Sequence, residues 1–146
     1  MSMRQIRVFL DSSVIIAGLA SKKGGSYEVL ALAELKIVLP CICEDVVTEV
    51  FRNVQKKLPG SVPYVYALFK KLPFIIIDPA EEDIAQAKKL INQKDASILA
   101  AAITGNVNWL LSLDKHFLKA DLMDLRGKKD IFQICSPGEF LEKILK

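Results

Sequence analysis

Short apolar runs that alternate with helical patterns constrain the fold of this chain most strongly. Each run is bounded by turn or helix signals and is too short to be a helix of its own. Strands separated by helices pair in parallel through helical crossovers. The sequence therefore predicts a three-layer α/β/α sandwich around a central, mostly parallel sheet of about five strands. The expected strands cover residues 6–10, 37–39, 74–77, 109–113 and 131–134.

Helical spacing fills the intervals between these runs. The clearest helix begins near Glu44, where apolar residues recur on one stripe until Pro59-Gly60. Pro40 is expected to stop the second strand, and Pro137 is expected in the first turn of a last helix. The other expected helices are a stretch ending at Gly18 and residues 26–35, 62–71, 80–92 and 95–104.

The length and the cysteine content limit the kinds of protein that this chain can be. The chain has 146 residues, which suits a single domain over residues 1–146 with one core. No apolar run approaches the roughly 20 residues of a membrane span, and no secretory cleavage pattern follows the first residues. Three cysteines without a C-x-x-C pair argue against a disulfide framework and a structural zinc site. We expect a cytoplasmic protein with buried thiols and no membrane partner.

The basic residues come in adjacent pairs, although the net charge is only +3. Such pairs are usually solvated helix faces, but several pairs lining one cleft would suit a phosphate backbone. Composition leaves both interpretations open. The pairs are Lys22-Lys23, Lys56-Lys57, Lys70-Lys71, Lys88-Lys89 and Lys128-Lys129.

Four carboxylates stand where such a fold would bring them together. Asp11 follows the first strand and Asp114 follows the fourth. In the usual doubly wound order these strands are neighbours that flank the ligand crevice at their carboxyl ends. Glu49 falls at the edge of the buried face of its helix, and Asp95 opens the next-to-last long helix. All four side chains can therefore point at one crevice.

Each carboxylate also has a purely structural interpretation. Asp11, Asp95 and Asp114 are all in positions where an acid can cap a helix. Glu49 can be a solvated helix residue. An acid at the end of a buried strand is costly without a partner, which favours a joint task for the set.

Four segments carry a resemblance to a known family. The chain resembles a PIN domain, the nuclease domain found in the toxins of many bacterial and archaeal toxin–antitoxin pairs, over nearly its whole length. The matching segments are Phe9-Leu10-Asp11-Ser12-Ser13-Val14-Ile15, Val46-Val47-Thr48-Glu49-Val50, Asp95-Ala96-Ser97-Ile98-Leu99-Ala100-Ala101-Ala102 and Leu111-Ser112-Leu113-Asp114-Lys115-His116-Phe117.

The resemblance implies a metal-dependent endoribonuclease that cleaves single-stranded RNA. Asp11, Glu49, Asp95 and Asp114 would be the catalytic acids that bind Mg²⁺ or Mn²⁺. Ser13 and Ser112 stand where the family has short polar residues and would support the site. A small antitoxin partner and a homodimer are also implied.

One position departs from the family pattern. His116 stands where many members have a further acid, so it is a candidate general base or ligand and equally a surface residue. The departure leaves an alternative open, a weak or inactive PIN-like module that binds RNA or a protein partner. Phosphatases of the haloacid dehalogenase type also place an acid after a first strand. They need a second acid two residues later, where this chain has Ser13.

Overall fold

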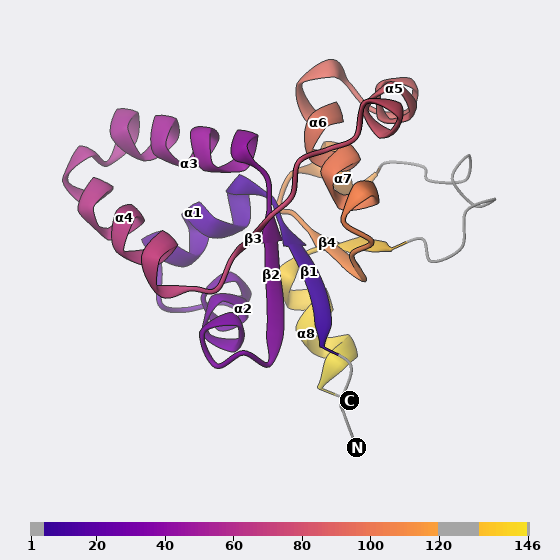
Figure 1. Cartoon of the computed structure of the whole chain (residues 1–146). Coiled ribbons are helices and arrows are strands. Elements are labelled where there is room, and N and C mark those ends of the chain that lie inside the picture. Colours follow the sequence, from indigo (N-terminus) through magenta and orange to yellow (C-terminus); the bar gives the residue numbers. More distant parts are fainter. Residues whose placement is uncertain (1–4, 120–131, 146) are drawn as a thin grey trace.

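A single parallel sheet forms the centre of the protein. The structure, a computed structural model, describes residues 5–119 and 132–145. In these ranges the sheet has the strand order β3-β2-β1-β4-β5, and every neighbouring pair runs parallel (Figure 1). The predicted sheet is confirmed. The strands are β1 (Ile6–Leu10), β2 (Val38–Ile42), β3 (Ile75–Ile76), β4 (Trp109–Leu111) and β5 (Gln133–Cys135).

Helices cover both faces of this sheet. α1, α2 and α8 pack together on one side, and α5 packs with α6 on the other (Figure 1). This arrangement confirms the predicted α/β/α sandwich. The helices are α1 (Ser12–Ala20), α2 (Gly25–Glu34), α3 (Glu44–Lys57), the 3-10 turn η1 (Pro59–Ser61), α4 (Val62–Lys71), α5 (Glu81–Leu90), α6 (Gln93–Thr104), α7 (Lys115–Leu118) and α8 (Pro137–Ile144).

The central strand β1 fixes the position of Asp11. Val8, Phe9 and Leu10 are completely buried, as expected for a strand covered by helices on both faces. β1 pairs with β2 on one side and with β4 on the other, so the predicted neighbourhood of the first and fourth strands is confirmed. The residues that follow β1 and β4 therefore emerge side by side at the carboxyl edge of the sheet.

The second strand does not stop where the sequence suggested. β2 runs through Pro40 to Ile42, so the prediction that Pro40 ends it is wrong. β3 pairs with β2 only at Cys41 and Ile42, which leaves Pro40 with a strand on one side only. A proline without an N–H is tolerated at such a half-edge position. In the last predicted strand, Ile131 lies outside the described residues.

Helix ends account for three of the lysine pairs. Lys56-Lys57, Lys70-Lys71 and Lys88-Lys89 occupy the last turns of α3, α4 and α5, where cations complement the helix dipole. Lys22-Lys23 is exposed after α1, and Lys128-Lys129 lies outside the described ranges. Within those ranges, no helix has the length and apolar character needed to cross a membrane.

Candidate functional site

Asp11 is the most buried carboxylate of the predicted site, with 4% of its surface exposed. It caps α1, and its Oδ1 accepts a hydrogen bond of 2.8 Å from the backbone N–H of Ser12. Its Oδ2 accepts from the hydroxyls of Ser13 at 3.0 Å and Ser112 at 2.7 Å. The capping interpretation is correct, but the cap uses only one of the three hydrogen bonds.

The surroundings of Asp11 have opposing effects on the pKa of its carboxyl group. Burial raises the pKa of the Asp11 carboxyl group above its usual range, and the negative charge of Glu49 raises it further. The hydrogen bonds from Ser112, Ser13 and the Ser12 amide lower the pKa, because they favour the charged form. In the described part of the chain no Lys, Arg or His forms an ion pair with Asp11. The site therefore offers a buried carboxylate that a cation would stabilise.

Ser112 joins Asp11 to Asp114. Its side chain is completely buried, and its Oγ accepts a 2.9 Å hydrogen bond from the backbone N–H of Asp114 while donating to Asp11. Ser13 makes a parallel link, because its Oγ accepts from the backbone N–H of Leu113 at 3.0 Å. Two serines thus connect the residues after β1 to those after β4.

Asp114 caps the short helix α7. Its Oδ1 accepts a 2.8 Å hydrogen bond from the backbone N–H of His116, which bears out the capping interpretation. The side chain of Asp114 is only half-buried, so part of the carboxylate faces solvent. His116 is exposed, and its ring forms no hydrogen bond or ion pair with another described residue. Its role as a base or ligand stays a prediction.

Glu49 reaches the same edge through a residue that sequence reasoning did not select. The hydroxyl of Ser12 donates a 2.7 Å hydrogen bond to Oε2 of Glu49, so α1 and α3 are linked beside Asp11. Glu49 is half-buried, as its position on the helical wheel indicated. A hydroxyl directly after Asp11 was the available signal for Ser12, but its partner depends on how α1 and α3 cross.

Asp95 lies in the first turn of α6 and is nearly buried. The interpretation of Asp95 as the helix cap is wrong, because Asn92 is the cap and its Oδ1 accepts from the Asp95 N–H at 3.0 Å. Among the described residues, no hydrogen bond reaches the Asp95 carboxylate. An acid here benefits from the helix dipole and keeps its oxygens available.

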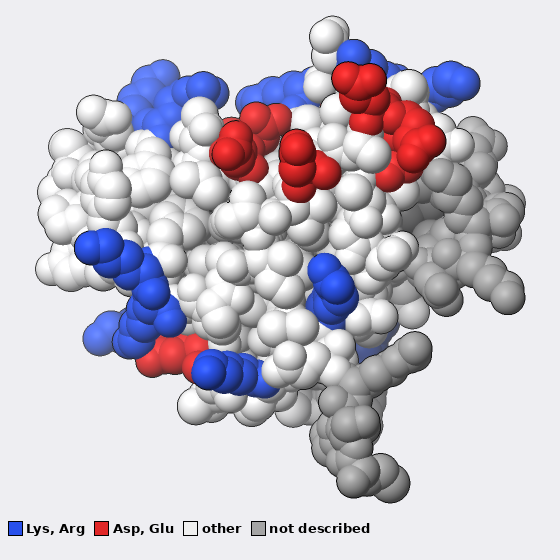
Figure 2. All heavy atoms as spheres, in the orientation of Figure 1, with Lys and Arg blue, Asp and Glu red and all other residues white. Residues whose placement is uncertain are grey.

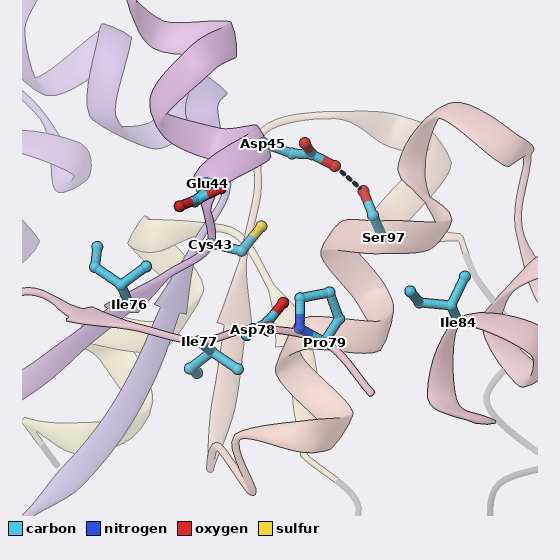
Figure 3. Close-up of a pocket in the computed structure, with 9 residues that line it drawn as sticks. All are labelled: Cys43, Glu44, Asp45, Ile76, Ile77, Asp78, Pro79, Ile84 and Ser97. Carbon is cyan, nitrogen blue, oxygen red and sulfur yellow. Dashed lines mark hydrogen bonds between the residues drawn. The ribbon is translucent and has the colours of Figure 1, made fainter. Parts of the chain in front are cut away.

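A cavity of about 390 Å³ lies between the ends of β2 and β3 and the helices α3, α5 and α6, and its lining includes none of the four predicted acids (Figure 3). Ser97 of α6 donates a hydrogen bond to Asp45 of α3 across it. Cys43 also lines the cavity, and burial raises the pKa of its thiol to about 11. Because that thiol stays protonated, the cavity contains no thiolate nucleophile from Cys43 at neutral pH.

The four acids do not form a ready-made metal cage. In residues 5–119 and 132–145, no three His, Cys, Asp or Glu side chains are arranged to hold a metal ion. The chemistry of the donors nevertheless fits a hard divalent cation, since the set supplies carboxylate oxygens and Asp11 is buried without a cationic partner. Asp11, Glu49 and Asp114 share one serine-linked network, and Asp95 belongs to a separate helix.

Comparison with known structures finds the same fold. DNA-bound VapBC from Salmonella typhimurium has a TM-score of 0.62 at 15% identity, covering 90% of this chain and 98% of that one. VapBC2 from Rickettsia felis, bound to a promoter DNA fragment, gives 0.61 at 15% identity over 89% and 98%. VapC20 of Mycobacterium tuberculosis, a sarcin–ricin loop cleaving toxin, gives 0.58 at 14% identity over 86% and 98%.

Comparison of sequences gives a more specific result. No curated protein matches this chain. The PIN domain family matches residues 7–116, which include all four predicted acids and both supporting serines. That match spans most of the chain, from β1 to the start of α7. The protein therefore belongs to the PIN domain family.

Proposed function

We propose that this protein is an endoribonuclease that uses Mg²⁺ or Mn²⁺ to hydrolyse phosphodiester bonds of single-stranded RNA. PIN domain proteins are in general metal-dependent ribonucleases. The observation that carries the proposal is the environment of Asp11. Its carboxylate is buried, receives three hydrogen bonds, has no cationic partner in the described ranges, and is linked by serines to Asp114 and Glu49.

In this proposal the acidic residues bind the metal ion and the serines orient the acids. Asp11, Glu49, Asp95 and Asp114 would hold the divalent ion, which when bound lowers the pKa of water and offsets charge on the phosphodiester. Ser12, Ser13 and Ser112 orient two of these carboxylates, as outer-shell partners commonly do. Hydrolysis adds one water across a P–O ester bond and leaves one phosphate end and one hydroxyl end.

The biological setting is part of the same proposal. Two of the similar solved structures are of VapBC bound to DNA, and a third is of a toxin that cleaves the sarcin–ricin loop. We therefore infer that this chain is the toxin of a toxin–antitoxin pair in the cytoplasm. A small antitoxin would bind it, and we retain the homodimer as the expected assembly.

The test is cleavage of a labelled single-stranded RNA by the purified protein. Reactions contain Mn²⁺, Mg²⁺ or EDTA and compare wild type with Asp95→Asn. Glu28→Gln is the matched control, because Glu28 is an exposed first-turn acid on α2, which packs on the opposite face of the sheet. We expect metal-dependent cleavage by wild type and Glu28→Gln, and none by Asp95→Asn.

The alternative is a catalytically weak or inactive module that binds RNA or a protein partner, and the presence of His116 in place of an acid favours it. An inactive module would cleave no RNA with either metal and would show no rise in melting temperature with Mn²⁺. Equal cleavage by Asp95→Asn would show that the activity does not depend on Asp95 and would refute the assigned site.

A further inference from the structure

Acidic and basic side chains share one stripe of α3. At 100° per residue, Asp45, Glu49, Arg52 and Lys56 fall within about 60° of the helix circumference. The two acids occupy the half of α3 that begins at the sheet, and the two bases occupy the other half. Figure 2 shows the same division, with acidic side chains over the start of α3 and basic ones over its far end.

The two cations on this stripe have no acidic partner among the described residues. Arg52 follows Glu49 by three residues, a spacing at which an ion pair often forms. Glu49 instead accepts the hydrogen bond from Ser12. In the described ranges the one ion pair within 4.0 Å joins Lys71 and Glu34, so Arg52 and Lys56 have no carboxylate partner there. Helix-dipole compensation explains a cation in the last turn, but Arg52 lies before that turn.

A shallow, solvent-open groove runs along the same part of α3. Its lining residues are Val47, Thr48, Phe51, Arg52, Gln55 and Lys56, and we call it the α3 groove. Tyr66 of α4 stands beside it, with its ring centroid 4.7 Å from that of Phe51. Tyr66 is 59% exposed, so most of its ring is available to a ligand.

We propose that the α3 groove binds the RNA strand that enters or leaves the cleavage site. The inference rests on the proposed function and adds the path of the substrate. Arg52 and Lys56, about 4.5 Å and 10.5 Å along the helix axis from Glu49, would contact successive phosphates. Tyr66 would stack on an unpaired base. Cationic grooves with exposed aromatic rings are typical of proteins that bind single strands without strong sequence preference.

The charge distribution favours RNA over a protein occupant. The acids of the site repel phosphates, so a strand needs cations immediately outside the site to remain bound. The α3 groove supplies them one helical turn from Glu49. An acidic protein segment is the competing occupant, and the test below separates the two.

The experiment measures binding of a fluorescein-labelled, 20-nucleotide single-stranded RNA by anisotropy. EDTA is present to prevent cleavage, and the salt concentration is varied from 50 to 200 mM. Each phosphate contact contributes about 0.7 to the slope of log affinity against log salt for single strands. We expect the double variant Arg52→Gln/Lys56→Gln to lose about 1.4 from this slope, which is a roughly sevenfold smaller salt effect over that range.

Two matched controls test whether the effects depend on where the substituted residues lie. One control removes the same positive charge elsewhere, and the other removes a tyrosine elsewhere. Lys36→Gln/Lys88→Gln removes the same charge from exposed lysines before β2 and at the end of α5, which lie outside the α3 groove, and should retain the wild-type slope. Tyr66→Ala should weaken binding about fivefold or more. Tyr64→Ala should have little effect, because Tyr64 is also exposed on α4, at 68%, but lines a separate hollow with Ile16 and Leu19.

Several results would overturn the inference. An unchanged salt slope in Arg52→Gln/Lys56→Gln would do so, as would an equal loss of slope in the lysine double variant. A change in oligomeric state without a change in RNA binding would assign the groove to a protein contact. If wild type cleaves RNA but the groove variants bind normally, only this inference fails. If the groove binds RNA as expected but no metal supports cleavage, the proposed function fails and the inference stands.

Discussion

Replacing Ser112 by alanine should destabilise the protein by about 3 kcal/mol at pH 7.5. The Ser112 hydroxyl is completely buried, donates to the Asp11 carboxylate at 2.7 Å and accepts from the Asp114 N–H at 2.9 Å. A hydrogen bond to a charged group contributes about 1.5–3 kcal/mol, and a buried donor left without an acceptor costs about 1–3 kcal/mol. At 2–4 °C per kcal/mol for a domain of this size, the melting temperature should fall by about 9 °C.

The loss should depend on pH in a defined direction. The Ser112 hydrogen bond lowers the pKa of Asp11, so its removal raises that pKa further above the ordinary value of 3.8. A carboxyl group with a raised pKa favours the folded state when it is protonated, and that contribution is lost as the pH rises through its folded pKa. The variant should therefore differ less from wild type at pH 5 than at pH 7.5.

The assay is urea unfolding of both proteins in EDTA at the two pH values. Ser97→Ala is the control, because Ser97 also donates to an aspartate, Asp45, but at an exposed position. That control should cost less than about 0.5 kcal/mol. Two results would refute the described role of Ser112. One is that Ser112→Ala lowers the free energy of unfolding by less than about 1 kcal/mol at pH 7.5, and the other is that it lowers it more at pH 5 than at pH 7.5.

Other outcomes follow from the same geometry. Ser12→Ala releases Glu49 and should raise the Mn²⁺ concentration needed for half-maximal cleavage about tenfold or more, whereas an unchanged metal requirement would contradict the Ser12–Glu49 link. Cleavage should increase with pH as Asp11 loses its proton, since metal ligands must be deprotonated, and a flat profile from pH 5 to 8 would count against Asp11 as a ligand. At 100 times its dissociation constant, Mn²⁺ should add about 2.7 kcal/mol to the free energy of unfolding, and Asp95→Asn should remove most of this gain. The three cysteines are buried with raised pKa values, so a thiol reagent at pH 8 should modify them only after unfolding, and rapid modification of the native protein would show that the core is open.

The strand order was predictable because it follows from general rules of parallel sheets. The alternation of strands and helices implied helical crossovers, and the usual doubly wound order placed β1 beside β4. Local signals were reliable where proline or glycine enforces a boundary, as in α4, whose predicted ends agree with Val62–Lys71. The rule failed at Pro40, because its cost depends on whether a strand lies on the N–H side, and sequence alone does not show that.

The site was predictable to the extent that it depends on the sheet. Ser112 and Asp11 meet because their strands are neighbours, whereas the hydrogen bond from Ser12 to Glu49 depends on helix crossing and side-chain rotamers. Asn92 is the stronger cap candidate, because its side chain accepts from the amide three residues later, whereas Asp95 already lies in the first turn of the helix. The catalytic roles of all these residues remain predictions.

The backbone at the carboxyl edge divides the site into two parts with different freedom of motion. The Asp11 N–H donates to Leu111 O at 3.0 Å and the Ser112 N–H donates to Cys135 O at 3.1 Å, so the sheet ladder continues beyond β1 and β4. These amides belong to the buried centre, and we expect them to be among the slowest to exchange with solvent. Glu49 is held at this edge by the Ser12 hydroxyl alone, and the Asp95 carboxylate accepts no hydrogen bond within the described ranges. When a cation binds, the conformational entropy that is lost would therefore come from ordering Glu49 and Asp95 on their helices, because the strand edge is already ordered.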